Sequence, residues 1–223
     1  IKFMIKIAPS TNPEREENLI NYVKTLEQTD ADFLHCDVMD GNFVENKCLS
    51  AKKLYEVSEN STIALDVHLM VSNPIQVWKE YYKSKPTIIT VHYESFKNKT
   101  NLFYLLNEIK KKKIMAGISV KPNTSISEIE RFLPLCDLVL VMSVEPGLSG
   151  QKFIDGTLTK IEYLKKVITE KQYNIKIEVD GGINEENVAK VYKAGADIVV
   201  MGNAVYKQKN RALFIKNIKN ITK

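Results

Sequence analysis

Eight short apolar segments recur along the chain, and segments with helical spacing separate most of them. The eight are rich in Val and Ile and are mostly apolar on both faces, which is typical of buried strands in a parallel sheet. In sequence order they are Lys6–Pro9, Phe33–Met39, Ile63–Met70, Thr87–His92, Ile114–Val120, Leu138–Val144, Ile175–Asp180 and Ile198–Met201. We expect each of them to form a strand.

The intervening segments carry apolar residues on one helical stripe. In Pro13–Glu27, proline stands in the first turn and Leu19, Val23 and Leu26 repeat at helical spacing. The other predicted helices are Ser50–Ser58, Pro74–Lys83, Leu102–Lys112, Ser127–Leu133, Asp155–Lys171, Asn184–Ala194 and Asn210–Ile221.

Eight strands that alternate with helices over 223 residues predict an α/β fold, a (β/α)8 TIM barrel, as a single domain of residues 1–223. The alternative is an open doubly wound sheet. That fold usually has a Gly-x-Gly-x-x-Gly turn after its first strand. Here the first strand continues into Ser10-Thr11-Asn12-Pro13 without a glycine, which favours the barrel.

Three predicted strands carry side chains of the types that bind metal ions or move protons. Side chains alternate between the two faces of a strand. The sets that share a face are His35, Asp37 and Met39; Asp66, His68 and Met70; and Glu178 and Asp180. In a (β/α)8 barrel, functional residues gather at the carboxyl ends of the strands.

Two histidines and two aspartates, namely His35, Asp37, His68 and Asp180, form a set that suits one divalent ion such as Zn²⁺, Fe²⁺, Mn²⁺ or Co²⁺. The alternative is that they are ordinary polar residues at a barrel rim. Met142 ends the sixth strand, so it is expected to join Met39 and Met70 in an apolar wall or, alternatively, to fill core space.

Glycines follow each of the last three strands. The segments are Gly147-Leu148-Ser149-Gly150, Gly181-Gly182 and Gly202-Asn203. Backbone amides that no side chain covers can hold a phosphate, and barrels often bind phosphate after their last two strands. The pattern indicates a phosphorylated ligand.

Composition narrows the class of protein. The net charge is +5, but 32 basic residues are interspersed with 27 acidic ones, which indicates a solvated surface and no nucleic-acid partner. No apolar run reaches the ~18–20 residues that span a bilayer, so no membrane partner is expected. Three cysteines, Cys36, Cys48 and Cys136, and a start without a secretory signal predict a reducing, cytoplasmic location.

Several longer segments resemble the ribulose-phosphate 3-epimerase family, in matching order along nearly the whole chain. They are Ala8–Ser10, Leu34–Val44, Leu65–Met70, Val141–Gly147, Gly150–Phe153 and Ile177–Ile183. The resemblance implies an isomerase that interconverts D-ribulose 5-phosphate and D-xylulose 5-phosphate in the pentose phosphate pathway. It also implies a sugar-phosphate substrate and a homo-oligomer.

By the same resemblance, His35, Asp37, His68 and Asp180 hold one divalent metal ion. Asp37 and Asp180 act as acid and base on opposite faces of C3, with an enediolate between them. The remaining implied contacts with substrate come from Ser10, His68, Met39, Met70, Met142, Gly147, Leu148, Ser149, Gly150, Gly181, Gly182, Gly202 and Asn203. Elementary chemistry agrees, because a proton beside a carbonyl leaves readily only where the developing charge is stabilised.

The chain departs from the family's usual sequence at Thr11–Arg15, Asn42, Glu45, Leu148–Ser149 and Asn203. By the resemblance, these rim and loop positions touch the tail of the substrate, so the changes affect which substrate is bound. A 3-epimerase of a ketohexose 6-phosphate such as D-allulose 6-phosphate is therefore the nearest alternative. A phosphate-binding barrel lyase or synthase would need a catalytic lysine, for which Lys121 is the candidate. A non-catalytic binding protein would be expected to lose at least one of the four proposed metal ligands, and none is lost.

Overall fold

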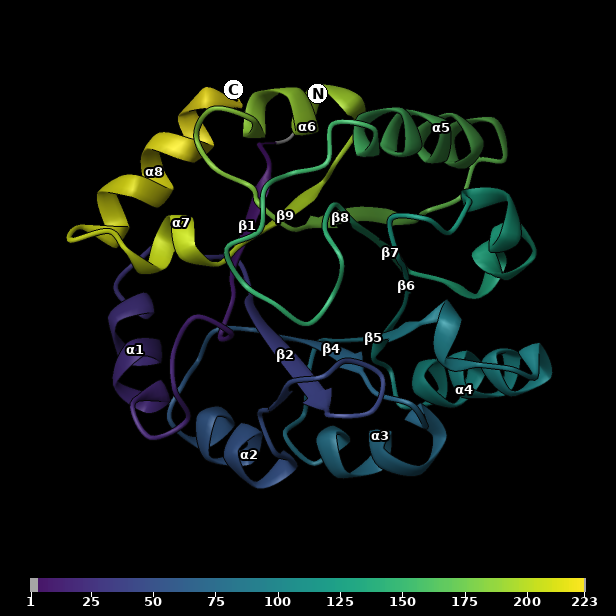
Figure 1. The fold of residues 1–223 in the computed structure, drawn as a ribbon, viewed down its shortest axis with the longest axis horizontal. Helices are drawn as coiled ribbons and strands as arrows, with labels where there is room; N and C mark the ends of the chain where they lie inside the picture. Colours follow the sequence, from purple (N-terminus) through teal and green to yellow (C-terminus); the bar gives the residue numbers. More distant parts are fainter. Residues whose placement is uncertain (1–3, 223) are drawn as a thin grey trace.

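The structure, a computed structural model, describes residues 4–222. Eight parallel strands form a barrel with helices around it (Figure 1). In barrel order the strands are β1 Lys6–Pro9, β2 Leu34–Asp40, β4 Leu65–Met70, β5 Ile88–His92, β6 Met115–Val120, β7 Leu138–Met142, β8 Lys176–Asp180 and β9 Ile198–Met201. β1 pairs with β9, and a parallel bridge from Ser10 to His35 closes the barrel between β1 and β2. The predicted (β/α)8 fold is confirmed.

The outer layer consists of α1 Leu19–Leu26, α2 Ala51–Glu59, α3 Pro74–Tyr82, α4 Lys99–Lys111, α5 Thr157–Glu170, α6 Val188–Ala194 and α8 Arg211–Ile221. Shorter pieces are α7 Asn203–Tyr206 and the 3₁₀ turns η1 Tyr93–Ser95, η2 Ile126–Glu128 and η3 Glu130–Leu135. A two-residue strand, β3 Lys47–Cys48, pairs antiparallel with the end of β2.

Several predicted boundaries differ from the structure; the helix predicted from Asn184, for example, begins at Val188, and three others have a local cause. The predicted helix Pro13–Glu27 begins only at Leu19, because the Thr11 and Arg15 carbonyls accept turn hydrogen bonds and the preceding residues bend over the barrel end. The predicted helix Ser127–Leu133 is replaced by η2 and η3, the latter containing Pro134, which has no amide to continue a helix. β7 stops at Met142 because its partner β8 ends at Asp180, and beyond it the Ser143 amide and hydroxyl both donate to the Asp180 carbonyl oxygen, the hydroxyl also to that of Gly181.

The barrel interior changes character along its axis. Residues near the amino ends of the strands, such as Ile88, Leu138 and Ile198, form an apolar plug. Nearer the carboxyl ends, fully buried polar side chains take over, among them His68 and His92. The period of two is confirmed on β2, where Cys36 and Val38 pack against the outer helices. The apolar plug therefore supports a polar chamber at one end.

Three aspartates brace the opposite end of the barrel. Each lies just before a strand or at the turn into it, and its carboxylate accepts a backbone amide of the neighbouring strand. The pairs are Asp32 with Ile7 (2.9 Å), Asp137 with Ala116 (3.0 Å) and Asp197 with Ile177 (2.9 Å). A lysine ammonium lies beside each carboxylate, from Lys219, Lys110 and Lys165 respectively. These contacts fix the register between neighbouring strands away from the polar chamber.

Among residues 4–222, no helix combines the length and the apolar character that a bilayer crossing requires.

Candidate active site

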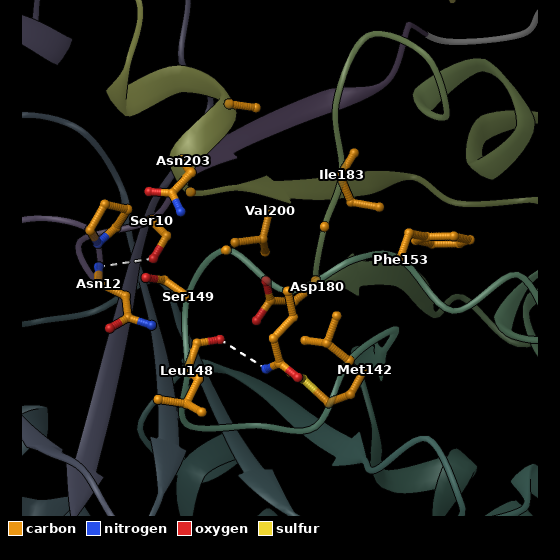
Figure 2. A pocket seen from close by; sticks show the side chains of 18 of the residues that line it. Ser10, Asn12, Met142, Leu148, Ser149, Phe153, Asp180, Ile183, Val200 and Asn203 are labelled. Carbon is orange, nitrogen blue, oxygen red and sulfur yellow. Dashed lines mark hydrogen bonds between the residues drawn. The ribbon is translucent and has the colours of Figure 1, made fainter.

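A cavity of about 460 Å³ opens at the carboxyl ends of the barrel strands. Figure 2 shows Ser10, Ser149 and Asn203 gathered on one side of it, with Asp180 near the middle and Met142 toward the opposite side. The predicted site residues that line it are Ser10, Asp37, Met39, Met70, Met142, Gly147, Leu148, Ser149, Gly150, Asp180, Gly181, Gly182, Gly202 and Asn203. His35 and His68 are fully buried beside the cavity and do not line it.

His35, Asp37, His68 and Asp180 converge on one point. One ligand atom from each lies within 4.8 Å of all the others. His35 Nε2 is 3.3 Å from His68 Nδ1 and 3.4 Å from Asp37 Oδ1, and these last two residues approach to 3.2 Å. Bonds of ~2.0–2.1 Å to a tetrahedral ion place ligand atoms roughly 3.3 Å apart. Three of the four residues therefore already have the spacing of a metal site, and Asp180 lies slightly farther off, at 4.0 Å from His35.

The two aspartates of this group have opposite electrostatic environments. Burial alone would raise the pKa of Asp37, but the charge and hydrogen bond of His35 beside it hold that pKa well below its usual value. Burial and the negative charge of Asp37 raise the pKa of Asp180 to about 7. Environments that separate the pKa values of two neighbouring carboxyl groups are typical of acid and base pairs.

The other ring nitrogen of His35 faces a second acidic group. Its Nδ1 lies 2.5 Å from Asp66 Oδ2 and 3.7 Å from Glu178 Oε1, and all three side chains are fully buried. Burial and, to a smaller extent, the negative charge of Asp66 raise the pKa of Glu178 well above its usual value. Burial would lower the pKa of His35, but Asp66 and Asp37 raise it well above normal. Asp66 therefore holds a proton on His35 Nδ1 and leaves Nε2 facing the four-residue group.

The cavity wall joins polar and apolar surfaces. The Ser10 hydroxyl donates to Asp37 Oδ2 over 2.6 Å, which fixes that carboxylate from the side of β1. Met39, Met70 and Met142 are almost completely buried and line the cavity. A thioether wall beside carboxylates limits water and adapts to the shape of a ligand.

The glycine segments line the cavity and pack closely on neighbouring loops. Gly181 and Gly182 have φ values of +125° and +65°, which favour glycine. A Cβ on Gly182 would lie 2.5 Å from the Phe153 amide nitrogen, so the turn after β8 packs directly on the segment after Gly150. Asn46 Nδ2 donates to the Gly147 carbonyl and ties the loop after β7 to the loop after β2.

Comparisons with known proteins identify the family of this chain. A model of the "Ribulose-phosphate 3 epimerase family" matches residues 6–206. The chain belongs to the ribulose-phosphate 3-epimerase family. It is 38% identical over 217 residues to ribulose-phosphate 3-epimerase of Bacillus subtilis, covering 97% of this chain and 99% of the relative. The chloroplastic ribulose-5-phosphate-3-epimerase of Arabidopsis thaliana is 39% identical over 215 residues, which cover 96% of this chain and 76% of that protein.

Solved structures confirm the fold. 3-Hexulose-6-phosphate synthase from Salmonella typhimurium superimposes with a TM-score of 0.72 at 13% identity, covering 98% of each chain. At this identity the likeness shows a shared barrel only. The family assignment makes the chain an isomerase.

Sequence reasoning missed several residues of this family member's site. Gln151, Lys152 and Lys207 also line the cavity, and the two lysines add positive charge there. Gln151 and Lys152 lie in a segment that resembles the family but were given no role, and no local pattern marks Lys207. Asn12, within the departures noted above, lines the cavity as well. His92 was also missed, and it directly contacts one of the four proposed metal ligands: its Nε2 lies 2.9 Å from His68 Nε2.

Proposed function

We propose that this chain is a metal-dependent ribulose-phosphate 3-epimerase that interconverts D-ribulose 5-phosphate and D-xylulose 5-phosphate. The observation that carries the proposal is a pair of carboxylates, Asp37 and Asp180, beside two histidines. Both carboxylates line a barrel cavity that glycine segments also line. Membership of the epimerase family supports the choice of reaction.

The four-residue group fits a divalent ion of the Zn²⁺, Fe²⁺, Mn²⁺ or Co²⁺ type. His35 would contribute Nε2 and His68 would contribute Nδ1, because these atoms face Asp37. When bound, such an ion stabilises the negative charge that the substrate develops as its C3 proton leaves. The set of two nitrogen and two oxygen ligands does not favour a soft ion such as Cu⁺.

Inversion at C3 needs one proton removed from one face and another delivered to the opposite face. Asp37 and Asp180 reach the cavity from β2 and β8, which lie on either side of β1 and β9. Asp180 is the more exposed of the two, with 18% of its side chain accessible against 4% for Asp37. We assign Asp37 and Asp180 as the acid and base pair and the buried methionines as the wall that keeps water from the intermediate.

The phosphate of the substrate would lie against the glycine segments. Loops after the last barrel strands, followed by a short extra helix, commonly bind phosphate in this fold. Here Gly181 and Gly182 follow β8, and Gly202 directly precedes α7. Lys152 and Lys207 also line the cavity and add positive charge that would attract the phosphate.

A ketohexose 6-phosphate such as D-allulose 6-phosphate is the alternative substrate, because Asn12, Leu148 and Ser149 at the tail end of the cavity differ from the family's usual residues. A lyase is less well supported, since Lys121 lies outside the cavity with its ammonium 4.5 Å from the Phe43 ring centroid. We further propose a homo-oligomer, as the resemblance implies, that consists of single-domain barrels and lies in the cytoplasm, as the strand pattern and the sparse cysteines indicate.

The test is a paired turnover assay after chelation and metal add-back. Apoprotein and protein reloaded with Zn²⁺, Mn²⁺, Fe²⁺ or Co²⁺ are each given ribulose 5-phosphate and allulose 6-phosphate. The proposal predicts metal-dependent epimerisation with a strong preference for ribulose 5-phosphate. A preference for the hexulose phosphate would replace the proposed substrate, and metal-loaded protein inactive on both would overturn the proposal.

A further inference from the structure

His68 Nε2 points away from the cavity, into a hydrogen-bonded row of buried groups. It lies 2.9 Å from His92 Nε2, and His92 Nδ1 lies 3.0 Å from Glu94 Oε2. His68 lies on β4, His92 closes β5 and Glu94 lies in η1. The row thus runs across neighbouring strands, behind the four-residue group.

Glu94 can only accept hydrogen bonds in this row. Its Oε1 receives the Lys121 backbone amide at 2.8 Å and the Thr124 hydroxyl at 2.5 Å. Lys160 of α5 donates to the carbonyl oxygens of Lys121, Pro122 and Thr124, so the loop that carries both donors is itself fixed. With Oε1 occupied by two donors, Oε2 faces His92 as an acceptor.

The direction of every hydrogen bond in the row follows from that acceptor. His92 Nδ1 must carry a proton to donate to Glu94. A neutral imidazole has one such proton, so His92 Nε2 is bare and accepts from His68 Nε2. The proton of His68 then sits on Nε2, and its Nδ1 is left bare toward Asp37 and His35.

Packing protects the two histidines of the row from water, and Glu94 at its end keeps 20% of its side chain exposed. His68 and His92 are fully buried and their rings stack with centroids 4.9 Å apart. Phe43, from the loop after β2, covers His92 with ring centroids 4.8 Å apart. In a dry site the proton positions are set by these fixed partners and not by exchange with solvent.

We propose that Glu94 and His92 are positioning residues that set the tautomer of His68, so that its Nδ1 is free to bind a metal ion. The inference rests on the proposed metal site of the four-residue group. Groups that hold the second nitrogen of a metal-binding histidine commonly change metal affinity by about 10–100-fold when they are lost.

Glu94→Gln provides a sharp test because it keeps the size of the side chain and reverses one hydrogen bond. The amide oxygen of Gln would stay with its two donors, Lys121 and Thr124, and its NH₂ would face His92. His92 Nδ1 would have to accept, its proton would move to Nε2, and the His68 proton would move to Nδ1. The atom that faces Asp37 would then be blocked.

The control is Thr124→Val, which removes one donor to Oε1 but leaves a carboxylate facing His92. Two quantities are measured on each full-length variant: Zn²⁺ affinity by competition with a chromophoric chelator, and the ¹⁵N shifts of the imidazole nitrogens without metal. Substrate is absent from both, so neither depends on epimerase activity.

In the wild type we expect protonated His92 Nδ1 and protonated His68 Nε2. Glu94→Gln should move both protons to the other ring nitrogen and weaken Zn²⁺ binding about 10–100-fold, whereas Thr124→Val should keep wild-type proton positions and affinity.

A wild-type His92 protonated on Nε2 overturns the inference even if a variant fails to fold. Unchanged proton positions and affinity in Glu94→Gln overturn it as well. If the expected shifts appear in a protein that epimerises neither sugar phosphate, the positioning role stands and the proposed function fails.

Discussion

Asp37 and Asp180 bring their carboxylate oxygens within 4.8 Å of each other from strands β2 and β8, yet their pKa values are driven in opposite directions. His35 beside Asp37 lowers the pKa of Asp37, whereas burial next to Asp37 raises that of Asp180 to about 7. The pair titrates as a coupled unit. A bound cation would draw protons from both, so the proposed metal binding and the proposed proton transfer would depend on the same pair of carboxylates.

Replacement of either carboxylate should stop turnover without unfolding the barrel. Asp37→Asn and Asp180→Asn each remove a proton carrier and a proposed metal ligand, so kcat should fall by at least ~10²–10⁴-fold. Initial rates with ribulose 5-phosphate and far-UV circular dichroism would check this. Asp30→Asn, at an exposed position, is the matched control and should be unaffected. Near-normal turnover in either active-site variant would rule out the two-carboxylate scheme.

Metal removal should lower stability as well as activity. An ion that binds only the folded state adds about 2.7 kcal/mol to the free energy of unfolding at ~100 times its dissociation constant. Chemical denaturation of apoprotein and Zn²⁺-loaded protein should therefore give different midpoints. The difference should vanish in Asp37→Asn, which lacks a proposed ligand. A midpoint that does not respond to metal in the wild type would contradict the assignment of the four-residue group.

Gly182→Ala should weaken binding of the phosphorylated substrate. The new Cβ would lie 2.5 Å from the Phe153 amide nitrogen at a φ of +65°, so the turn after β8 must move. We expect KM to rise by about tenfold or more, since ~1.4 kcal/mol of lost binding is tenfold, with a smaller change in kcat.

Gly156→Ala is the matched control for that variant. No atom lies within 4 Å of the point that its new Cβ would occupy, and its φ of −57° suits any residue. Its KM should equal that of the wild type, with stability unchanged or higher by about 0.4–1 kcal/mol. Equal KM values for both variants would separate the turn at Gly182 from phosphate binding.

Asp40→Asn should destabilise the protein in a pH-dependent way. Burial would raise the pKa of Asp40, but amides of Ser72, Phe43 and Asn42 lower it to about 2. The folded pKa is below the unfolded value of ~3.9, so this stabilisation is present above pH ~4 and is lost as the pH falls toward 2.

We expect the Asp40→Asn variant to lose about 1 kcal/mol at pH 7, after allowance for solvent screening. Urea unfolding at pH 7 and at pH 3 measures the difference between variant and wild type. That difference should shrink at pH 3. A difference that is constant or larger at pH 3 would contradict the assignment of a depressed pKa to Asp40.

The barrel and its central residues could be predicted because both depend on short-range periodicity. Strands buried on both faces show as apolar runs, and a period of two places His35 and Asp37 on one face whatever the tertiary details. The carboxyl end of a barrel strand then locates Asp180. The convergence of these residues in the structure follows from topology alone.

The features that could not be predicted from the sequence depend on contacts between segments that are far apart along the chain. In the sequence, His92 is the last residue of a predicted apolar strand, and its contact with His68 exists only because the fold brings the two residues together. The start of α1 at Leu19 could not be predicted either. Pro13–Glu27 has a helical pattern throughout, but its first residue, Pro13, lines the cavity and lies outside the helix. Such features arise from tertiary packing that overrides local propensity.

The central claim is proton exchange at C3 of a pentulose phosphate, and the most direct measurement is the reaction in D₂O followed by NMR. Metal-loaded protein is given ribulose 5-phosphate, and the xylulose 5-phosphate formed is examined for deuterium. A proton removed by one aspartate and replaced by the other predicts one deuterium at C3 and none at C1. Deuterium at C1, or xylulose 5-phosphate formed without any deuterium, would contradict the account.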